Sequence, residues 1–298
     1  KLVIQDYPGT DEARGALSGL KNVYVDQNNV DGYFEYARKL GSFAQVSEHE
    51  QDSLSYISAE NQYMSGDCEK SSQSFQKYIE NHPEGSFILN AHFYKGDCNY
   101  RQKLYDEALA SFDYVISKPK NVFTEQSLLG AARIAFFQND YMKALNYYQG
   151  LSGLTETRVN LLEARVGLMR CNYFLEDHSA SVEACRNVLE TEKLPEAIAR
   201  EARFKLAKSL FAKDRMMLAL EEFKKVATEV TSPEGAESKY RVAEILFKRD
   251  NFKEADKVIA DFAGRTTPHQ YWMAMSFILW ADIFAAQGDY FQAIETLQ

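Results

Sequence analysis

Seven charged residues recur along the chain at intervals of 36 to 38 residues, and their signs follow a regular order. Two acids come first, three bases follow, and two acids end the row. The row consists of Glu60, Asp97, Arg133, Arg170, Lys208, Glu244 and Asp282. Clustered bases can pair with a partner's carboxylates and steer its approach. We therefore interpret Arg133, Arg170 and Lys208 as candidate contacts to an acidic segment of a protein or peptide.

A second set of acids offers these bases another partner. It comprises Glu163, Glu201 and Glu237, each seven residues, about two helical turns, before a member of the row. Ion pairs between the two sets would make the row a structural seam instead of a binding surface. Lys205 and Arg241 extend the basic zone by one turn. The sequence alone leaves both interpretations open.

No catalytic or metal-binding pattern is present in the sequence. GxGxxG, P-loop, GxSxG and HExxH motifs are all missing, and the five histidines are scattered. The four cysteines are Cys68, Cys98, Cys171 and Cys185, and they form neither a CxxC pair nor a zinc-ligand spacing. We therefore expect no enzyme activity, no cofactor and no metal. A Cys171–Cys185 disulfide in an oxidising compartment is left open.

Composition narrows the class of protein and of partner. The net charge is −9, which disfavours nucleic acid as the main partner because phosphate binding needs a basic surface. Glycine (15) and proline (6) are scarce and 45% of residues are hydrophobic, as in a folded helical protein. No apolar stretch is long enough to span a bilayer. The chain does not begin with Met, so we expect it to be part of a longer protein.

The charged row belongs to a repeat of helical hairpins. A small residue on the second helix of each hairpin recurs as Ser71, Ala108, Ala144, Ser181, Ala219, Ala255 and Ala293. Four residues later come the larger Phe75, Phe112, Tyr148, Cys185, Phe223, Ile259 and Leu297. Twelve residues earlier, on the first helix, come Ala59, Gly96, Ala132, Met169, Ala207, Ala243 and Ala281. Small residues at matched positions allow two helices to approach closely, so we expect seven αα-hairpins in register.

This pattern resembles the tetratricopeptide repeat (TPR) from Ser53 to Gln298. The matching features are the small residue on the first helix, the turn, the small-to-large pair on the second helix and a trailing proline. An aromatic residue opens several second helices, as Tyr105, Tyr141, Phe252 and Tyr290. The period of 36 to 38 exceeds the usual ~34 residues. The fourth repeat is degenerate, with Met169, His178, Ser181 and Cys185 at signature positions.

The resemblance implies an all-α, right-handed αα-superhelix (TPR solenoid) of about eight helical hairpins, the last incomplete. We expect a divergent N-terminal hairpin within residues 1–46, with Thr10 or Asp11 as N-cap, and seven repeats in one solenoid over residues 47–298. The prolines Pro83, Pro119, Pro195, Pro233 and Pro268 are expected in the links between hairpins. The remaining link is expected to contain Gly150 and Gly153 instead.

In such a solenoid the first helices line a concave groove, which would hold the charged row. One aromatic per repeat would lie in the same groove, as Tyr63, Tyr100, Phe136, Tyr173, Phe211 and Phe247. These side chains could form a ladder for a bound peptide, or they could pack between neighbouring helices; both remain open. The Lys/Asn clamp of chaperone-binding TPR proteins is not carried over, because its asparagine places hold Asp97, Arg133 and Arg170.

The resulting hypothesis is a non-enzymatic scaffold that binds a protein or peptide segment in the groove. The Tyr- and Asn-rich repeats resemble bacterial cell-envelope TPR proteins of the Tol–Pal accessory or outer-membrane assembly type, which implies a periplasmic or outer-membrane-associated location. Alternatively, this is the regulatory or sensor region of a larger protein with a catalytic, DNA-binding or membrane domain elsewhere. The alternative location is the cytoplasm. Self-association through the C-terminal end is a third expectation.

Overall fold

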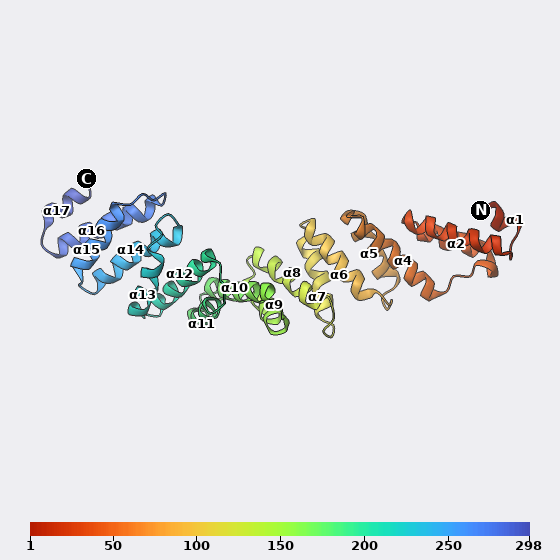
Figure 1. The fold of residues 1–298 in the computed structure, drawn as a ribbon, viewed down its shortest axis with the longest axis horizontal. Helices are drawn as coiled ribbons and strands as arrows, with labels where there is room; N and C mark the ends of the chain where they lie inside the picture. Colours follow the sequence, from red (N-terminus) through yellow and green to blue (C-terminus); the bar gives the residue numbers. More distant parts are fainter. The chain divides into compact units, whose positions relative to one another are not determined.

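The computed structural model describes residues 1–298, which form helices and no strand. The chain divides into two compact units, Lys1–Asn139 and Asp140–Gln298, called unit 1 and unit 2 below. Figure 1 labels the helices in chain order. None of them is both long and apolar enough to cross a membrane.

Unit 1 contains eight α-helices and one short 3₁₀-helix. They are α1 (Leu2–Asp6), α2 (Asp11–Asp26), α3 (Val30–Lys39), η1 (Gly41–Ala44), α4 (Glu48–Met64), α5 (Cys68–Asn81), α6 (Ile88–Arg101), α7 (Tyr105–Ile116) and α8 (Thr124–Phe137). Sequential helices pack as antiparallel hairpins, and α6 also packs on α4 and α8. The first helix of each hairpin, called helix A, therefore packs on the next helix A.

Unit 2 repeats the same arrangement. Its helices are α9 (Tyr141–Leu154), α10 (Arg158–Phe174), α11 (His178–Leu189), α12 (Glu196–Ala212), α13 (Met216–Val226), α14 (Pro233–Lys248), α15 (Phe252–Ala263), α16 (Gln270–Ala286) and α17 (Tyr290–Thr296). The A helices α10, α12, α14 and α16 pack on one another in sequence, while each also packs on its own second helix, helix B.

The repeated small residues lie where the sequence predicts close helix contact. On helix B all seven are buried, as are the seven first-helix residues, Met169 included. Phe112 on α7 shows why they must be small. A Cβ added to Gly96 on α6 would lie 2.9 Å from its ring, and one added to Gly130 on α8 would lie 2.6 Å from it. Three helices of unit 1 thus meet around one phenyl ring.

Each hairpin turn contains a residue in the left-handed helical region. These residues are Asn28, Gly66, Lys103, Asn139, Glu176, Asp214, Asp250 and Gly288, with φ between 53° and 82°. In most of these turns the next residue donates its N–H to the carbonyl five residues earlier, as Leu104 does to Asn99 at 2.9 Å. This hydrogen bond defines the Schellman motif, which satisfies carbonyls at the end of helix A. Two of these residues are glycines and four are Asn or Asp, which tolerate this region, so the unfavourable backbone is confined to Lys103 and Glu176.

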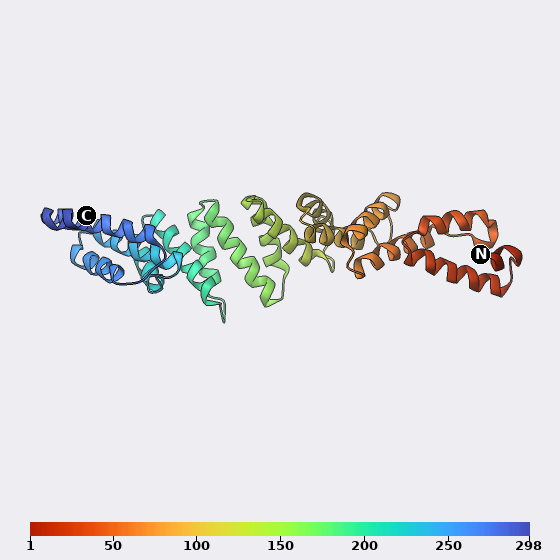
Figure 2. The same cartoon turned by 90° about the horizontal axis from the view of Figure 1, so that it is seen from above.

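Helices α2 and α3 lie in the region of the predicted N-terminal hairpin, and Figure 2 shows this pair antiparallel at the red end of the chain. Thr10 is the N-cap, since its side chain accepts the N–H of Ala13 at 3.2 Å. The left-handed Asn28 precedes Gly66 by 38 residues, which is the period of the array. The hairpin therefore shares the turn geometry and register of the repeats that follow. Its separation as a domain of residues 1–46 stays a prediction.

Two predicted links were placed wrongly. Gly150 and Gly153 lie inside α9, so the proline-free link is the shorter Thr155–Thr157, where Thr157 caps α10. Pro233 lies inside a helix as the first residue of α14, with Ser232 as N-cap. Proline is tolerated there because the first helical N–H has no partner within the helix. The prediction for Gly150 and Gly153 rested on the weak helix propensity of glycine alone. Tertiary packing overrides that propensity in α9.

Gly167 supports a first prediction about packing. A Cβ at this position on α10 would lie 2.4 Å from the ring of Tyr148 on α9, and Tyr148 is itself buried. We expect Gly167→Ala to lower the free energy of unfolding by about 1–3 kcal/mol through overpacking. Gly153→Ala is the matched control, because its Cβ meets nothing within 4 Å and should be stabilising. Urea unfolding of both variants tests this; equal responses would refute the packing argument.

Candidate functional site

Every member of the charged row lies on a helix A. Unit 1 contributes Glu60 on α4, Asp97 on α6 and Arg133 on α8; unit 2 contributes Arg170 on α10, Lys208 on α12, Glu244 on α14 and Asp282 on α16. The predicted aromatics Tyr63, Tyr100 and Phe136 lie on the same helices in unit 1, and Tyr173, Phe211 and Phe247 in unit 2. All six aromatics are half-buried.

In unit 1 the acids of the row hold tyrosines in place. Tyr56 donates its hydroxyl to Glu60 at 2.7 Å, and Tyr63 donates to Asp97 at 2.8 Å. Arg101 pairs with the same Asp97 carboxylate at 2.7 Å. Burial, followed by the hydrogen bond to Asp97, raises the pKa of Tyr63, so its hydroxyl remains a donor at physiological pH. The Tyr63–Asp97 hydrogen bond joins the neighbouring A helices α4 and α6, while the other two contacts lie within one helix.

In unit 2 two bases of the row pair with acids on the next helix A. Arg170 binds Glu201 through two hydrogen bonds of 2.9 and 2.7 Å, and Lys208 Nζ lies 2.9 Å from Glu237 Oε1. The salt-bridge alternative raised by the sequence is therefore present at these two positions. Burial alone would raise the pKa of Glu201. The hydrogen bonds from Arg170 outweigh this effect and hold the pKa below its usual value.

The ion pairs continue along α14. Arg241 lies 3.4 Å from Glu237 and 2.8 Å from Glu244, and Lys248 lies 2.9 Å from the same Glu244. Acids and bases therefore alternate across this face. Each carboxylate is shared or held by more than one polar group, which fixes its position but leaves little unpaired charge.

Cations also lie over the aromatic rings of this face. Lys205 Nζ is 4.0 Å from the centroid of the Tyr173 ring, and Lys248 Nζ is 5.0 Å from that of Phe211. Burial lowers the pKa of Lys205, and the nearby Glu201 partly opposes that shift. The rings and the charges together form one polar-aromatic surface, in which cation–π contacts add to the ion pairs.

A pocket of about 300 Å³ opens in this surface. Its walls include Tyr173, Lys208 and Phe211 from the prediction, together with Phe174, His178 and Arg241. The Nδ1 atom of His178 is buried and has no hydrogen-bond partner. In the sequence, His178 stands out only as a departure from the repeat. It places a polar imidazole where several other repeats have Tyr or Phe.

Comparison with known proteins identifies the repeat. A family model described as "Tetratricopeptide repeat" matches residues 59–121, which cover α5, α6 and α7 and most of the first hairpin. Residues 59–121 therefore carry the tetratricopeptide-repeat pattern. No curated protein sequence matches it. TPR domains generally mediate protein–protein or peptide interactions.

Several solved structures are similar to this chain. A complex reported as Naa15/Naa10 bound to HypK-THB is similar with a TM-score of 0.50 and 13% identity, covering 83% of this chain and 36% of that one. YrrB, reported as a TPR protein with an unusual peptide-binding site, has a TM-score of 0.47 and 18% identity over 75% of this chain and 97% of its own. A TPR protein from Parabacteroides merdae has a TM-score of 0.39 and 13% identity over 88% and 98%. The predicted all-α TPR solenoid is confirmed as the fold class.

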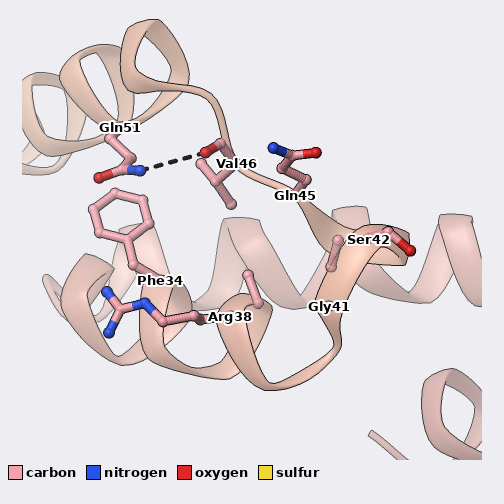
Figure 3. A pocket seen from close by; sticks show the side chains of 9 residues that line it. Phe34, Arg38, Gly41, Ser42, Gln45, Val46 and Gln51 are labelled. Atoms are coloured by element: carbon pink, nitrogen blue, oxygen red, sulfur yellow. Dashed lines mark hydrogen bonds between the residues drawn. The ribbon is translucent and has the colours of Figure 1, made fainter.

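A second pocket of the TPR chain lies in unit 1, before the first regular repeat. It measures about 420 Å³ and lies between α3, η1 and the start of α4. Figure 3 shows Phe34 pointing toward Gln51, with Arg38 beside it, and the hydrogen bond from Gln51 to the carbonyl of Val46. The pocket has a single charged residue in its wall, so it lacks the combination of rings and charges seen in unit 2.

The remaining titratable groups of the TPR chain form no cluster of three or more His, Cys, Asp or Glu side chains suited to a metal ion. All four cysteines are free thiols, so the disulfide considered for Cys171 and Cys185 is not formed. Both of these thiols are buried, and burial raises their pKa to about 12. They behave as small apolar side chains of the core.

Proposed function

We propose that this chain is a non-enzymatic scaffold that binds a protein or peptide segment on the A-helix face of unit 2. The observation that carries the proposal is the pocket lined by Tyr173, Phe211 and Lys208. Aromatic walls accept an apolar side chain of the partner, while fixed charges at the rim select its neighbours. The whole predicted groove, including Arg133 and the unit 1 residues, remains part of this proposal.

The partner's charge follows from the ion pairs. An acidic segment would compete with Glu237 for Lys208 and Arg241, and with Glu201 for Arg170. A carboxylate of the partner must displace one of the protein's own carboxylates. Each new ion pair therefore adds only a modest net binding free energy.

Three finer parts of the proposal rest on the sequence alone. We place the protein in the periplasm or at the outer membrane, as part of a cell-envelope assembly, because of its resemblance to envelope TPR proteins. We also propose self-association at the C-terminal end.

A matched pair of variants tests the binding proposal. Lys208→Gln and Glu237→Gln break the same 2.9 Å ion pair, so their effects on folding have the same sign. Their effects on an acidic partner should be opposite. We expect Lys208→Gln to weaken binding by about 3- to 10-fold and Glu237→Gln to strengthen it by a similar factor, each corresponding to roughly 1 kcal/mol.

The measurement starts from a displayed library of random 12-residue peptides, selected on the wild-type chain. Selected peptides are then titrated against both variants and against Phe211→Ala by fluorescence anisotropy. Phe211→Ala should weaken every peptide that uses the pocket. Selection of basic peptides, or parallel responses of the two glutamine variants, would contradict the acidic-partner part. Binding that is unaffected by Phe211→Ala would remove the pocket from the proposal.

A further inference from the structure

Two cysteines from different repeats lie against each other in unit 1. Cys68 is the first residue of α5, a helix B, and Cys98 lies on α6, the next helix A. Their Sγ atoms are 2.6 Å apart, about half an ångström more than a disulfide bond. The two residues are 30 positions apart in sequence, so their contact is a product of the fold. Both are free thiols in this structure.

Packing alone does not account for a cysteine at position 68. The equivalent position, three residues before the small residue of helix B, holds Tyr105, Tyr141, His178, Met216, Phe252 and Tyr290 in the other repeats. Cys68 is the smallest side chain at this place, and it is half-buried. Cys98 is fully buried two residues after Gly96. The junction between α5 and α6 therefore brings two thiols together.

We propose that Cys68 and Cys98 form a reversible disulfide that links the first regular repeat to the second. The oxidant is a small-molecule or protein disulfide that reaches the chain from solution. Cys68 attacks one sulfur of that disulfide and releases one external thiol, which leaves a mixed disulfide. Cys98 then attacks the Cys68 sulfur and releases the second thiol. The protein loses two protons and two electrons, and the external disulfide is reduced to two thiols.

The order of the two steps follows from exposure. Cys68 is accessible from solvent, while Cys98 is enclosed between helices. Burial, followed by the hydrogen bond to Cys68, raises the pKa of the Cys98 thiol. Cys98 therefore holds little thiolate and is out of reach of an external disulfide. It can still resolve the mixed disulfide once it has lost its proton to solvent, because its sulfur already lies next to that of Cys68 and the second step is intramolecular, which offsets the small thiolate fraction.

The cross-link would act on the surface described above. Cys98 follows Asp97, whose carboxylate holds the hydroxyl of Tyr63 and the guanidinium of Arg101. On the other side, Gln102 donates its side-chain N–H to the carbonyl of Cys68 at 3.1 Å. A covalent bond at this point would fix α5 against α6 and limit local opening between the two repeats. Oxidation thus stiffens the N-terminal part of the A-helix face.

The test exposes the full folded chain to oxidised glutathione at pH 8, followed by acid quenching, intact mass and non-reducing peptide mapping. We expect the wild type to lose two hydrogens and to yield a Cys68–Cys98 cross-linked peptide. The Cys171→Ser/Cys185→Ser variant should give the same product. Cys98→Ser should stop at a glutathione adduct on Cys68, and Cys68→Ser should remain unmodified. The oxidised chain should unfold about 5 °C higher, reversibly with dithiothreitol.

Several results would overturn the proposal. The first is that the folded wild type keeps all four thiols while the same treatment oxidises the urea-unfolded chain. Another is a stable glutathione adduct on Cys68 of the wild type, which would show that Cys98 cannot resolve it. A map dominated by other pairings would also refute the assignment. Because these readouts involve no partner, their outcome is independent of the peptide-binding proposal.

Discussion

Phe112→Ala should lower the free energy of unfolding of the repeats in unit 1 by about 3–5 kcal/mol, among the largest effects available in this chain. The ring is 3% exposed on α7 and lies between Gly96 on α6 and Gly130 on α8. A truncated side chain leaves a cavity, and two walls of that cavity are glycines with no side chain to move into it. The backbone would have to shift to close the gap, which close-packed interiors resist.

Urea unfolding of the full chain, combined with hydrogen exchange, measures this effect. Exchange should accelerate first in α6, α7 and α8, because neighbouring repeats stabilise one another. Phe291→Ala serves as the control: that ring is 70% exposed, so its loss should cost less than about 0.5 kcal/mol. If Phe112→Ala lowers the free energy of unfolding by less than about 1 kcal/mol, the ring is not tightly packed between the two glycines.

The regular spacing of small residues was sufficient to predict the fold. Ala59, Ala108 and Ala144 are completely buried because each lies where two helices meet, and a larger residue at that spacing would separate them. Helix ends were predicted less well. The sequence indicates the cap at Thr10, because a side-chain oxygen before a helix is a local signal. It does not indicate that Gly150 continues a helix, since that depends on what α9 packs against.

Six of the eight left-handed turn residues are Gly, Asn or Asp, which tolerate this region, but Lys103 and Glu176 could not be predicted from residue type. Lys103 and Glu176 have φ of 63° and 57°, although neither residue favours that region. Their conformation is imposed by the Schellman hydrogen bonds and by the packing of the two helices that the turn joins. A repeat-based alignment could have found them, because they share one register with Gly66 and Gly288.

The sequence indicated which helices carry the charged side chains and named Glu201 and Glu237 as alternative partners for the bases, but it left open whether these ion pairs form. Sequence spacing places Arg170 and Lys208 on A helices, as the structure has them. The partner of each base lies 29 or 31 residues away, on the next helix A, so the pairing depends on how two repeats pack. The same limit applies to the pocket and to the Cys68–Cys98 contact. Each combines side chains from different repeats, and each repeat is regular only in its small residues.

The buried carboxylate of Asp52 on α4 supports the second large prediction. It accepts the hydroxyl of Tyr78 on α5 and the N–H of Ser86, at 2.9 Å, in the link before α6. Tyr78 in turn accepts the N–H of Phe87 at 3.1 Å. Gly85 completes this junction, because a Cβ there would lie 2.6 Å from the Asp52 carboxylate. One carboxylate thus holds two helices and the following link together.

Asp52→Ala should cost about 2–4 kcal/mol at pH 7, because it leaves the buried Tyr78 hydroxyl without an acceptor and removes the hydrogen bond to the Ser86 N–H. Tyr78→Phe in the same background completes a double-mutant cycle, in which the two losses should be strongly non-additive. Additive losses would show that the contact between these two side chains contributes little to stability.

The cost of Asp52→Ala should also depend on pH. Burial alone would raise the pKa of Asp52, but the hydrogen bonds from Tyr78 and Ser86 outweigh it and hold the pKa below its ordinary value. A depressed folded-state pKa adds stability that is present above the unfolded pKa of about 3.9 and is lost as the pH falls through the folded value. Urea midpoints of wild type and variant should therefore differ most between pH 5 and 7 and converge as the pH falls below about 4. A difference that stays constant down to pH 2.5 would mean that the ionised carboxylate is not what holds this junction.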